Sequence, residues 1–181
     1  FYTMGLGLAP WYAAFMMRTH RMETAEVGLW LGVILSASAL FGVLAGGYIA
    51  SRWLAGNERG HMLLSAAALL IVVPCFLGVL LFPNKHHALL SFIPLMIVFQ
   101  VFIGPAYALM QRLVADEMRA TTMALVMLLA NLLGMGAAPQ VVGILSDAFT
   151  PRFGTDGLRY AMLAMSFVAF WSSYHFWRVA G

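Results

Sequence analysis

Charged residues are scarce in this sequence. Asp, Glu, Lys and Arg make up only 9% of its 181 residues, whereas apolar residues make up 62%. Soluble domains carry about 25% charged and about 45–50% apolar residues. A chain of this length has too little interior to hide such an excess of apolar side chains from water. A water-soluble globule is therefore excluded, and we expect a membrane protein.

Basic runs and cysteine pairs are also lacking. Ten Lys and Arg residues exceed seven Asp and Glu residues, for a net charge of +3, but they are scattered through short connectors. Proteins that bind nucleic acid carry a basic stripe or patch instead, so we expect no nucleic-acid partner. The single cysteine, Cys75, excludes an internal disulfide framework and a cysteine-based metal site. Its apolar surroundings indicate a packing role.

Enzymatic motifs are missing from the chain. His86 and His87 have no Cys, Asp or Glu at metal-ligand spacing, and Ser146 and Asp147 have no histidine partner nearby in the sequence. The sequence also lacks a glycine-rich loop of the kind that cradles phosphates. We therefore expect no enzyme activity, no metal and no cofactor.

Long apolar runs account for most of the chain. A membrane helix requires about 20 mainly apolar residues, whereas a membrane β-barrel would show alternating segments of about ten residues. The pattern predicts an all-α, multi-pass membrane protein without a separate soluble domain. Its six predicted spans cover residues 1–17, 27–53, 62–82, 88–109, 121–145 and 160–177.

Charge does not set the orientation of these spans. An even number of spans predicts that both chain ends lie on one side, yet five basic residues fall on each side of the membrane. The positive-inside rule therefore gives no direction. Phe1 already lies inside an apolar run, with no initiator Met or basic leader before it. We expect the chain to be a fragment or one half of a longer polypeptide.

Small residues recur at four-residue spacing in two spans. Such spacing places them on one helix face, where backbones can approach closely. We expect the second and fifth spans to be the central packing helices. The residues concerned are Gly28, Gly32, Ser36, Gly42 and Gly46 in the second span, and Ala130, Gly134 and Ala138 in the fifth.

The middle of the spans holds neutral polar residues and no ionisable ones. In the fourth span, Gln100, Gly104, Tyr107 and Gln111 follow one another at steps of four, three and four, along one helix face. Gln100 falls near the membrane centre, where an unpaired amide is costly. It either bonds to a neighbouring helix or lines a wet cavity. Pro105 removes a backbone hydrogen bond and predicts a bend in this helix.

Further candidates lie at similar depth. Asn131 in the fifth span and Ser36 in the second either line a substrate path or bond to a nearby backbone carbonyl. Phe99 and Phe102, with Tyr2 and other aromatics of the first span, suit an apolar or amphiphilic ligand. The alternative for such aromatics is a lipid-facing or interfacial position. Absence of a mid-span carboxylate means that any proton-titrating residue should lie outside this chain.

Two groups of motifs resemble the major facilitator superfamily. The first looks like the signature that follows the second helix of each half of these transporters, although Ser51 stands where an Asp is usual. The second is similar to the spinster-like branch, in which animal members carry His at the position of Asn131. The motifs are residues 46–52 with Arg59, then residues 104–109, 119–125, 131–134 and 142–147.

This resemblance implies the second half of a twelve-helix bundle, occupying residues 1–181, with the N-terminal half absent from the chain. It also implies cytoplasmic chain ends and a central cavity lined by the first, second, fourth and fifth spans. The resemblance suggests an amphiphilic substrate such as a lysophospholipid or sphingoid-like lipid. The headgroup would meet Gln100, Tyr107, Asn131 and Ser36, and Phe99 and Phe102 would meet the chain.

The expected function is therefore secondary active transport by alternating access, coupled to protons, in a bacterial inner membrane. We expect the motif residues to shape the cytoplasmic gate, with Arg119 bound to the end of a neighbouring helix or to lipid phosphate. Alternatively, the arginines only set topology. Two other functions stay open: an exporter of a small polar metabolite or drug, and a non-transporting six-helix membrane scaffold. The gate residues are Gly47, Arg52, Arg59, Arg119 and Asp147.

Overall fold

The computed structural model describes residues 2–52 and 57–180, and over these ranges the chain is helical without a strand. Phe1 and Trp53, the outer limits of two predicted spans, lie outside the described residues, as does Gly181. The all-α prediction is confirmed. The longer helices are α1 (Ala9–His20), α2 (Thr24–Arg52), α3 (Glu58–Leu81), α4 (Lys85–Arg112), α5 (Arg119–Ala130), α6 (Ala138–Phe153) and α7 (Gly157–Ala180).

Short helical segments of other pitch adjoin these helices. Two are π-helical, with a wider turn than the α-helix. Two are 3₁₀ turns that lead into α5 and α7. The π-helical segments are η1 (Thr3–Gly7) and η3 (Asn131–Ala137), and the 3₁₀ segments are η2 (Asp116–Met118) and η4 (Gly154–Asp156).

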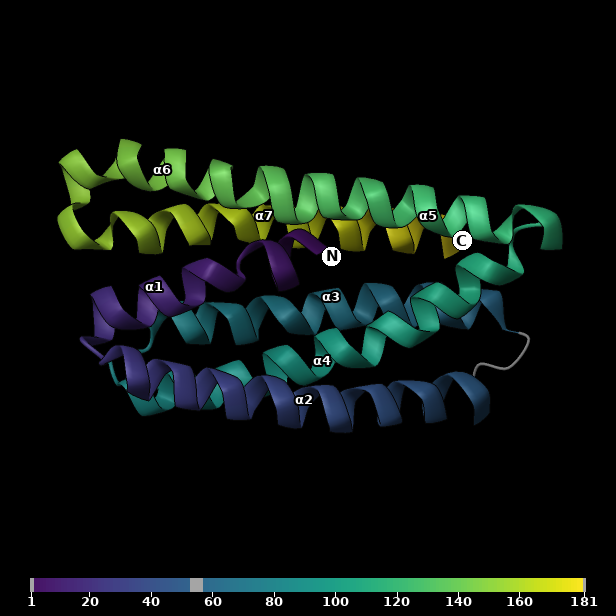
Figure 1. The fold of residues 1–181 in the computed structure, drawn as a ribbon, viewed down its shortest axis with the longest axis horizontal. Coiled ribbons are helices and arrows are strands. Elements are labelled where there is room, and N and C mark those ends of the chain that lie inside the picture. The colour runs from purple at the N-terminus through teal and green to yellow at the C-terminus, as the bar shows by residue number, and fades with distance from the viewer. Residues whose placement is uncertain (1, 53–56, 181) are drawn as a thin grey trace.

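The helices form one elongated bundle whose members run back and forth along a common axis (Figure 1). Within the described residues, four helical stretches are long and apolar enough to cross a membrane, ending with a continuous one through α5, η3, α6 and α7. The pair η1–α1 occupies the first predicted span and is shorter. The N-terminal end lies midway along the bundle, and the C-terminal end lies towards one end of it (Figure 1).

The centre of the bundle is built by α3 and α4. α4 crosses obliquely and contacts both α2 and α3, while α3 also contacts α7 (Figure 1). Half of the most apolar stretch of α3 is buried, against 22% for α2. Within the described residues, α2 and the stretch through α5, η3, α6 and α7 are thus less buried than α3 and α4, although α2 packs closely on α4. Four-residue spacing indicates where a backbone can be approached, but it does not say that a neighbour is there.

Glycines of α2 illustrate this difference. A Cβ added to Gly42 or Gly46 would collide with α4, at 2.5 Å from Gln100 Cβ and 2.3 Å from the Val101 carbonyl oxygen respectively. Gly28, Gly32 and Gly47 have nothing within 4 Å of the same position. Among these glycines of α2, only Gly42 and Gly46 thus pack against another helix within the described chain.

Aromatic side chains of α1 belong to the hydrophobic core. Tyr12 is 2% exposed and meets Phe92 edge-on, with ring centroids 4.8 Å apart. Its hydroxyl donates to the backbone carbonyl of Met4, 3.1 Å away. The Trp11 indole N–H donates to the Pro139 carbonyl, 3.1 Å away, and so ties α1 to α6. These two aromatics hold the helices together.

Candidate functional site

The two π-helical segments contact each other through glycine. A Cβ on Gly7 of η1 would lie 2.1 Å from the carbonyl oxygen of Gly134 in η3. A Cβ on Gly134 would lie 2.7 Å from the Cβ atom of Tyr2. The backbones can meet only because neither glycine has a side chain. π-Helical turns inside longer helices are often found at functional sites. This contact lies midway along the bundle and brings Tyr2 against α4.

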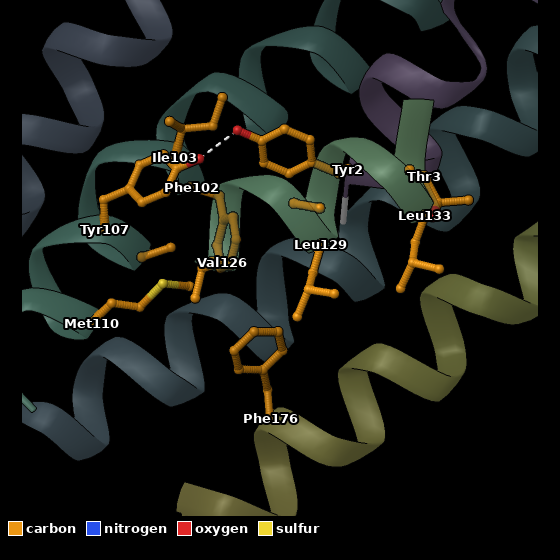
Figure 2. Close-up of a pocket in the computed structure, with 13 residues that line it drawn as sticks. Tyr2, Thr3, Phe102, Ile103, Tyr107, Met110, Val126, Leu129, Leu133 and Phe176 are labelled. Carbon is orange, nitrogen blue, oxygen red and sulfur yellow. Dashed lines mark hydrogen bonds between the residues drawn. The ribbon is translucent and has the colours of Figure 1, made fainter. Parts of the chain in front are cut away.

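A cavity of about 290 Å³ opens beside this contact (Figure 2). Its walls come from η1, α4, α5, η3 and α7, and they are almost entirely apolar. Phe102 and Phe176 form one part of the wall, with their ring centroids 5.8 Å apart in an edge-on contact. Other lining residues include Tyr2, Ile103, Tyr107, Met110, Val126 and Leu133.

A second cavity of about 130 Å³ lies between η1, α2 and α4. Phe99 and Gln100 line it together with Leu35 of α2. Tyr2 and Ile103 line both cavities. The two spaces therefore adjoin at Tyr2 and Ile103, which lie between them.

A hydroxyl pair marks the boundary between the cavities. The Tyr2 hydroxyl is hydrogen-bonded to the Tyr107 hydroxyl, and Figure 2 shows the bond joining Tyr2, the residue before η1, to Tyr107 of α4. The Gln100 amide, which is half-buried, has no hydrogen bond to any residue that the structure describes. An interhelical bond to another described residue is thus not the role of Gln100, and its amide is available to a ligand in the second cavity.

The structure brings together four of the six predicted substrate residues. Phe99 and Gln100 line one cavity, and Phe102 and Tyr107 line the other. Asn131 and Ser36 line neither of them. Asn131 is exposed, and its side-chain amide donates to the Met127 carbonyl of its own helix, 2.7 Å away. Ser36 is exposed on α2.

Among the predicted gate residues, the three arginines lie at helix ends, whereas Gly47 lies within α2 and Asp147 within α6. Arg119 forms an ion pair with Asp116 at 2.7 Å, and its Nε donates to the Gln111 carbonyl in the last turn of α4, at 2.8 Å. The expectation that Arg119 binds the end of a neighbouring helix is thereby met. Arg52 and Asp147 are exposed, and neither forms an ion pair with a described residue. Arg59 and Gly47 are also exposed.

Tyr2 is the residue that sequence reasoning undervalued. It appeared only as one of several aromatics in the first span, because no sequence pattern pointed to a π-helical turn at η1. The sequence signal for a close contact at η1 was the presence of Gly7 and Gly134, since glycines in two different spans allow their backbones to approach closely. Among the described residues, groups of three or more His, Cys, Asp or Glu side chains that could hold a metal are absent.

Comparison with known proteins gives relatives for most of the chain. No family model matches it. An MFS-type efflux pump of Mycolicibacterium smegmatis (strain ATCC 700084 / mc(2)155) is 29% identical over 161 residues, which are 89% of this chain and 37% of the pump. The motif resemblance to the major facilitator superfamily is thus supported by an independent match.

Solved structures share the fold. The crystal structure of a bacterial homolog to the human lysosomal transporter Spinster, inward-facing and unoccupied, matches with a TM-score of 0.78 and 24% identity, over 99% of this chain and 44% of that one. The inward-facing and occupied form matches with a TM-score of 0.81 and 23% identity, over 99% and 46% respectively. The chain spans less than half the length of each relative. An efflux pump and a homolog to a transporter are relatives in agreement with the expectation that the chain is not an enzyme.

Proposed function

Because this multi-pass membrane chain is a homologue of an MFS-type efflux pump and has the fold of half of a Spinster-type transporter, we propose that it forms the C-terminal half of a major facilitator transporter. A second bundle of helices would complete the protein, and the two halves would rock around a site near the membrane centre. We place the transporter in a bacterial inner membrane. Proton coupling is part of the proposal, with the titrating carboxylate supplied by the other half.

The substrate class follows from the adjoining cavities. Their walls are apolar, and the few polar groups converge near Tyr2: the two tyrosine hydroxyls and the Gln100 amide. Ligand sites that are mostly apolar with a few placed polar groups favour amphiphilic molecules. We infer a lysophospholipid or sphingoid-like lipid, whose polar group would meet Gln100 and the tyrosines and whose chain would lie along Phe102. The adjoining cavities at Tyr2 are the observation that carries this proposal.

Substitution of Gln100 tests the proposal. In proteoliposomes, Gln100→Leu should lower the flux of a fluorescent lysophospholipid about 2- to 10-fold, the range expected for losing one hydrogen bond. Gln111→Leu is the matched control, because Gln111 is exposed near the end of the same helix and lines neither cavity. Equal flux in both variants, with unchanged melting temperatures, would remove Gln100 from the site.

Export of a small drug-like molecule is the second candidate, favoured by the efflux-pump relative and by the modest size of the larger cavity. A ligand that binds the folded protein raises its melting temperature. Soluble compounds that raise the melting temperature, where lysophospholipids do not, would select this candidate.

A further inference from the structure

The beginning of α4 carries two grooves, whose lining residues differ from those of both cavities. One, of about 190 Å³, lies between α4 and α2 and is lined by Trp30, Ile34, His86, Leu89, Leu90 and Ile93. The other, of about 400 Å³ and more open, lies on the side of α3 and is lined by Phe82, His87, Leu90, Ser91 and Pro94. Leu90 belongs to both grooves and is 60% exposed, so it forms the ridge between them.

Each groove ends in a histidine. His86 and His87 are neighbours in the first turn of α4, and both are exposed. The His87 ring meets the Phe82 ring at 5.9 Å between centroids. Beside His86, Lys85 forms an ion pair with Glu26 of α2 at 2.7 Å, so the carboxylate nearest the α2 groove is neutralised. Imidazole N–H donors are thus left at the head of two apolar grooves.

We propose that this surface binds one diacyl phospholipid of the surrounding bilayer. The molecule would straddle α4, with one acyl chain in each groove, the Leu90 ridge between the chains, and the phosphate accepting hydrogen bonds from His86 and His87. Because the grooves begin at a helix end that the sequence places at the membrane surface, the depth of the histidines matches that of phosphate. Trp30, in the α2 groove, belongs to the residue type enriched at this depth.

Two grooves on either side of Leu90 fit the two acyl chains of a diacyl lipid, and this fit distinguishes it from other lipids of the bilayer. A single-chain lipid would fill one groove and leave the other side of Leu90 uncovered, whereas a diacyl lipid covers both. The α4 residues that line the grooves end at Ile93 and Pro94, whereas Met96 is the first α4 residue that lines a cavity, so no α4 residue is shared between grooves and cavities. The proposed lipid therefore does not occupy the cavities, and the inference rests on the chain lying in a membrane with this face of α2 and α4 turned to lipid and away from the other half.

Native mass spectrometry of the purified protein in mild detergent tests this site. Phosphatidylglycerol, lysophosphatidylglycerol and diacylglycerol are each added at matched concentration, and retained adducts are compared between the natural protein and His86→Ala/His87→Ala. We expect the double substitution to lower phosphatidylglycerol retention about tenfold, as the loss of two hydrogen bonds predicts. It should leave the retention of diacylglycerol, which has no phosphate, unchanged. The natural protein should retain less lysophosphatidylglycerol than phosphatidylglycerol, because a single chain covers only one groove. Equal phosphatidylglycerol retention in both proteins would overturn the proposal.

A second pair of variants tests the ridge without touching the histidines. Leu90→Trp should obstruct both grooves and lower diacyl lipid retention, whereas Leu70→Trp should not, because Leu70 is 53% exposed on α3 and lines neither groove. Equal retention in these two variants would also overturn the proposal. Lysophospholipid flux should be unchanged in Leu90→Trp, so failure of this inference and failure of the proposed transport function give different results.

Discussion

The crossing of α2 over α4 allows a prediction with an internal control. A methyl group on Gly46 would lie 2.3 Å from the Val101 carbonyl oxygen, whereas ordinary contact begins at 3.4 Å. The helices would therefore have to separate by about 1 Å (3.4 minus 2.3) in Gly46→Ala. The obstructing atom is backbone and cannot rotate aside. Gly32, in the same helix, has nothing within 4 Å of the added atom, so Gly32→Ala is the matched control.

The magnitude follows from comparing these two variants. Both gain the same helix propensity, about 1 kcal/mol for Gly to Ala, so this gain cancels in the difference. What remains is the cost of overpacking, about 1–3 kcal/mol. For a domain of roughly this size, about 2–4 °C of melting temperature corresponds to each kcal/mol. We expect Gly46→Ala to melt about 2–12 °C below Gly32→Ala.

Thermal unfolding in detergent measures this difference. A dye that becomes fluorescent on reacting with a thiol can report the exposure of Cys75, the only cysteine of the chain. Gly42→Ala, which would meet Gln100 Cβ at 2.5 Å, should behave like Gly46→Ala. If Gly46→Ala and Gly32→Ala melt at the same temperature, α2 and α4 do not approach as closely as described here, and the reasoning is refuted.

Three further outcomes are expected from thermal unfolding, followed by circular dichroism where the pH is varied. The Tyr2→Phe and Tyr107→Phe substitutions should be non-additive, with a coupling of about 0.5–1.5 kcal/mol for their shared hydrogen bond; strict additivity would contradict that bond. Tyr12→Phe should destabilise the protein by about 1–3 kcal/mol because it leaves a buried carbonyl of η1 without its donor, and an unchanged melting temperature would argue against that contact. Burial, and secondarily the Arg159 charge, lowers the pKa of His20 below its ordinary value of 6.5, so the folded state favours neutral imidazole. Stability should be full above pH 6.5 and fall below it, and His20→Gln should weaken this pH dependence of the melting temperature between pH 8 and 5; an identical dependence would exclude His20.

The position of the site was only partly predictable. Gln100 and Tyr107 stood out because a polar residue amid an apolar run must have a reason to be there. Nothing comparable marked η1, since a π-helical turn has no sequence pattern and its glycines differ little from those of an ordinary helix. Asn131 satisfied the same criterion as Gln100, yet it bonds to its own helix. A polar residue near the middle of a membrane span does not reveal whether its side chain points into a cavity or bonds to its own helix.

Composition determined that this chain is a membrane protein, because so many apolar side chains require a lipid environment. The length of the uninterrupted apolar runs determined that it is all-α. The motifs determined its resemblance to a major facilitator half. Only the tertiary structure decided that α3 and α4 form the centre, that Gly46 is packed and Gly32 open, and that Tyr2 meets Tyr107 between two cavities. Hydropathy and spacing act along a single helix, whereas these contacts depend on the angle and depth at which helices cross, which packing between distant segments fixes.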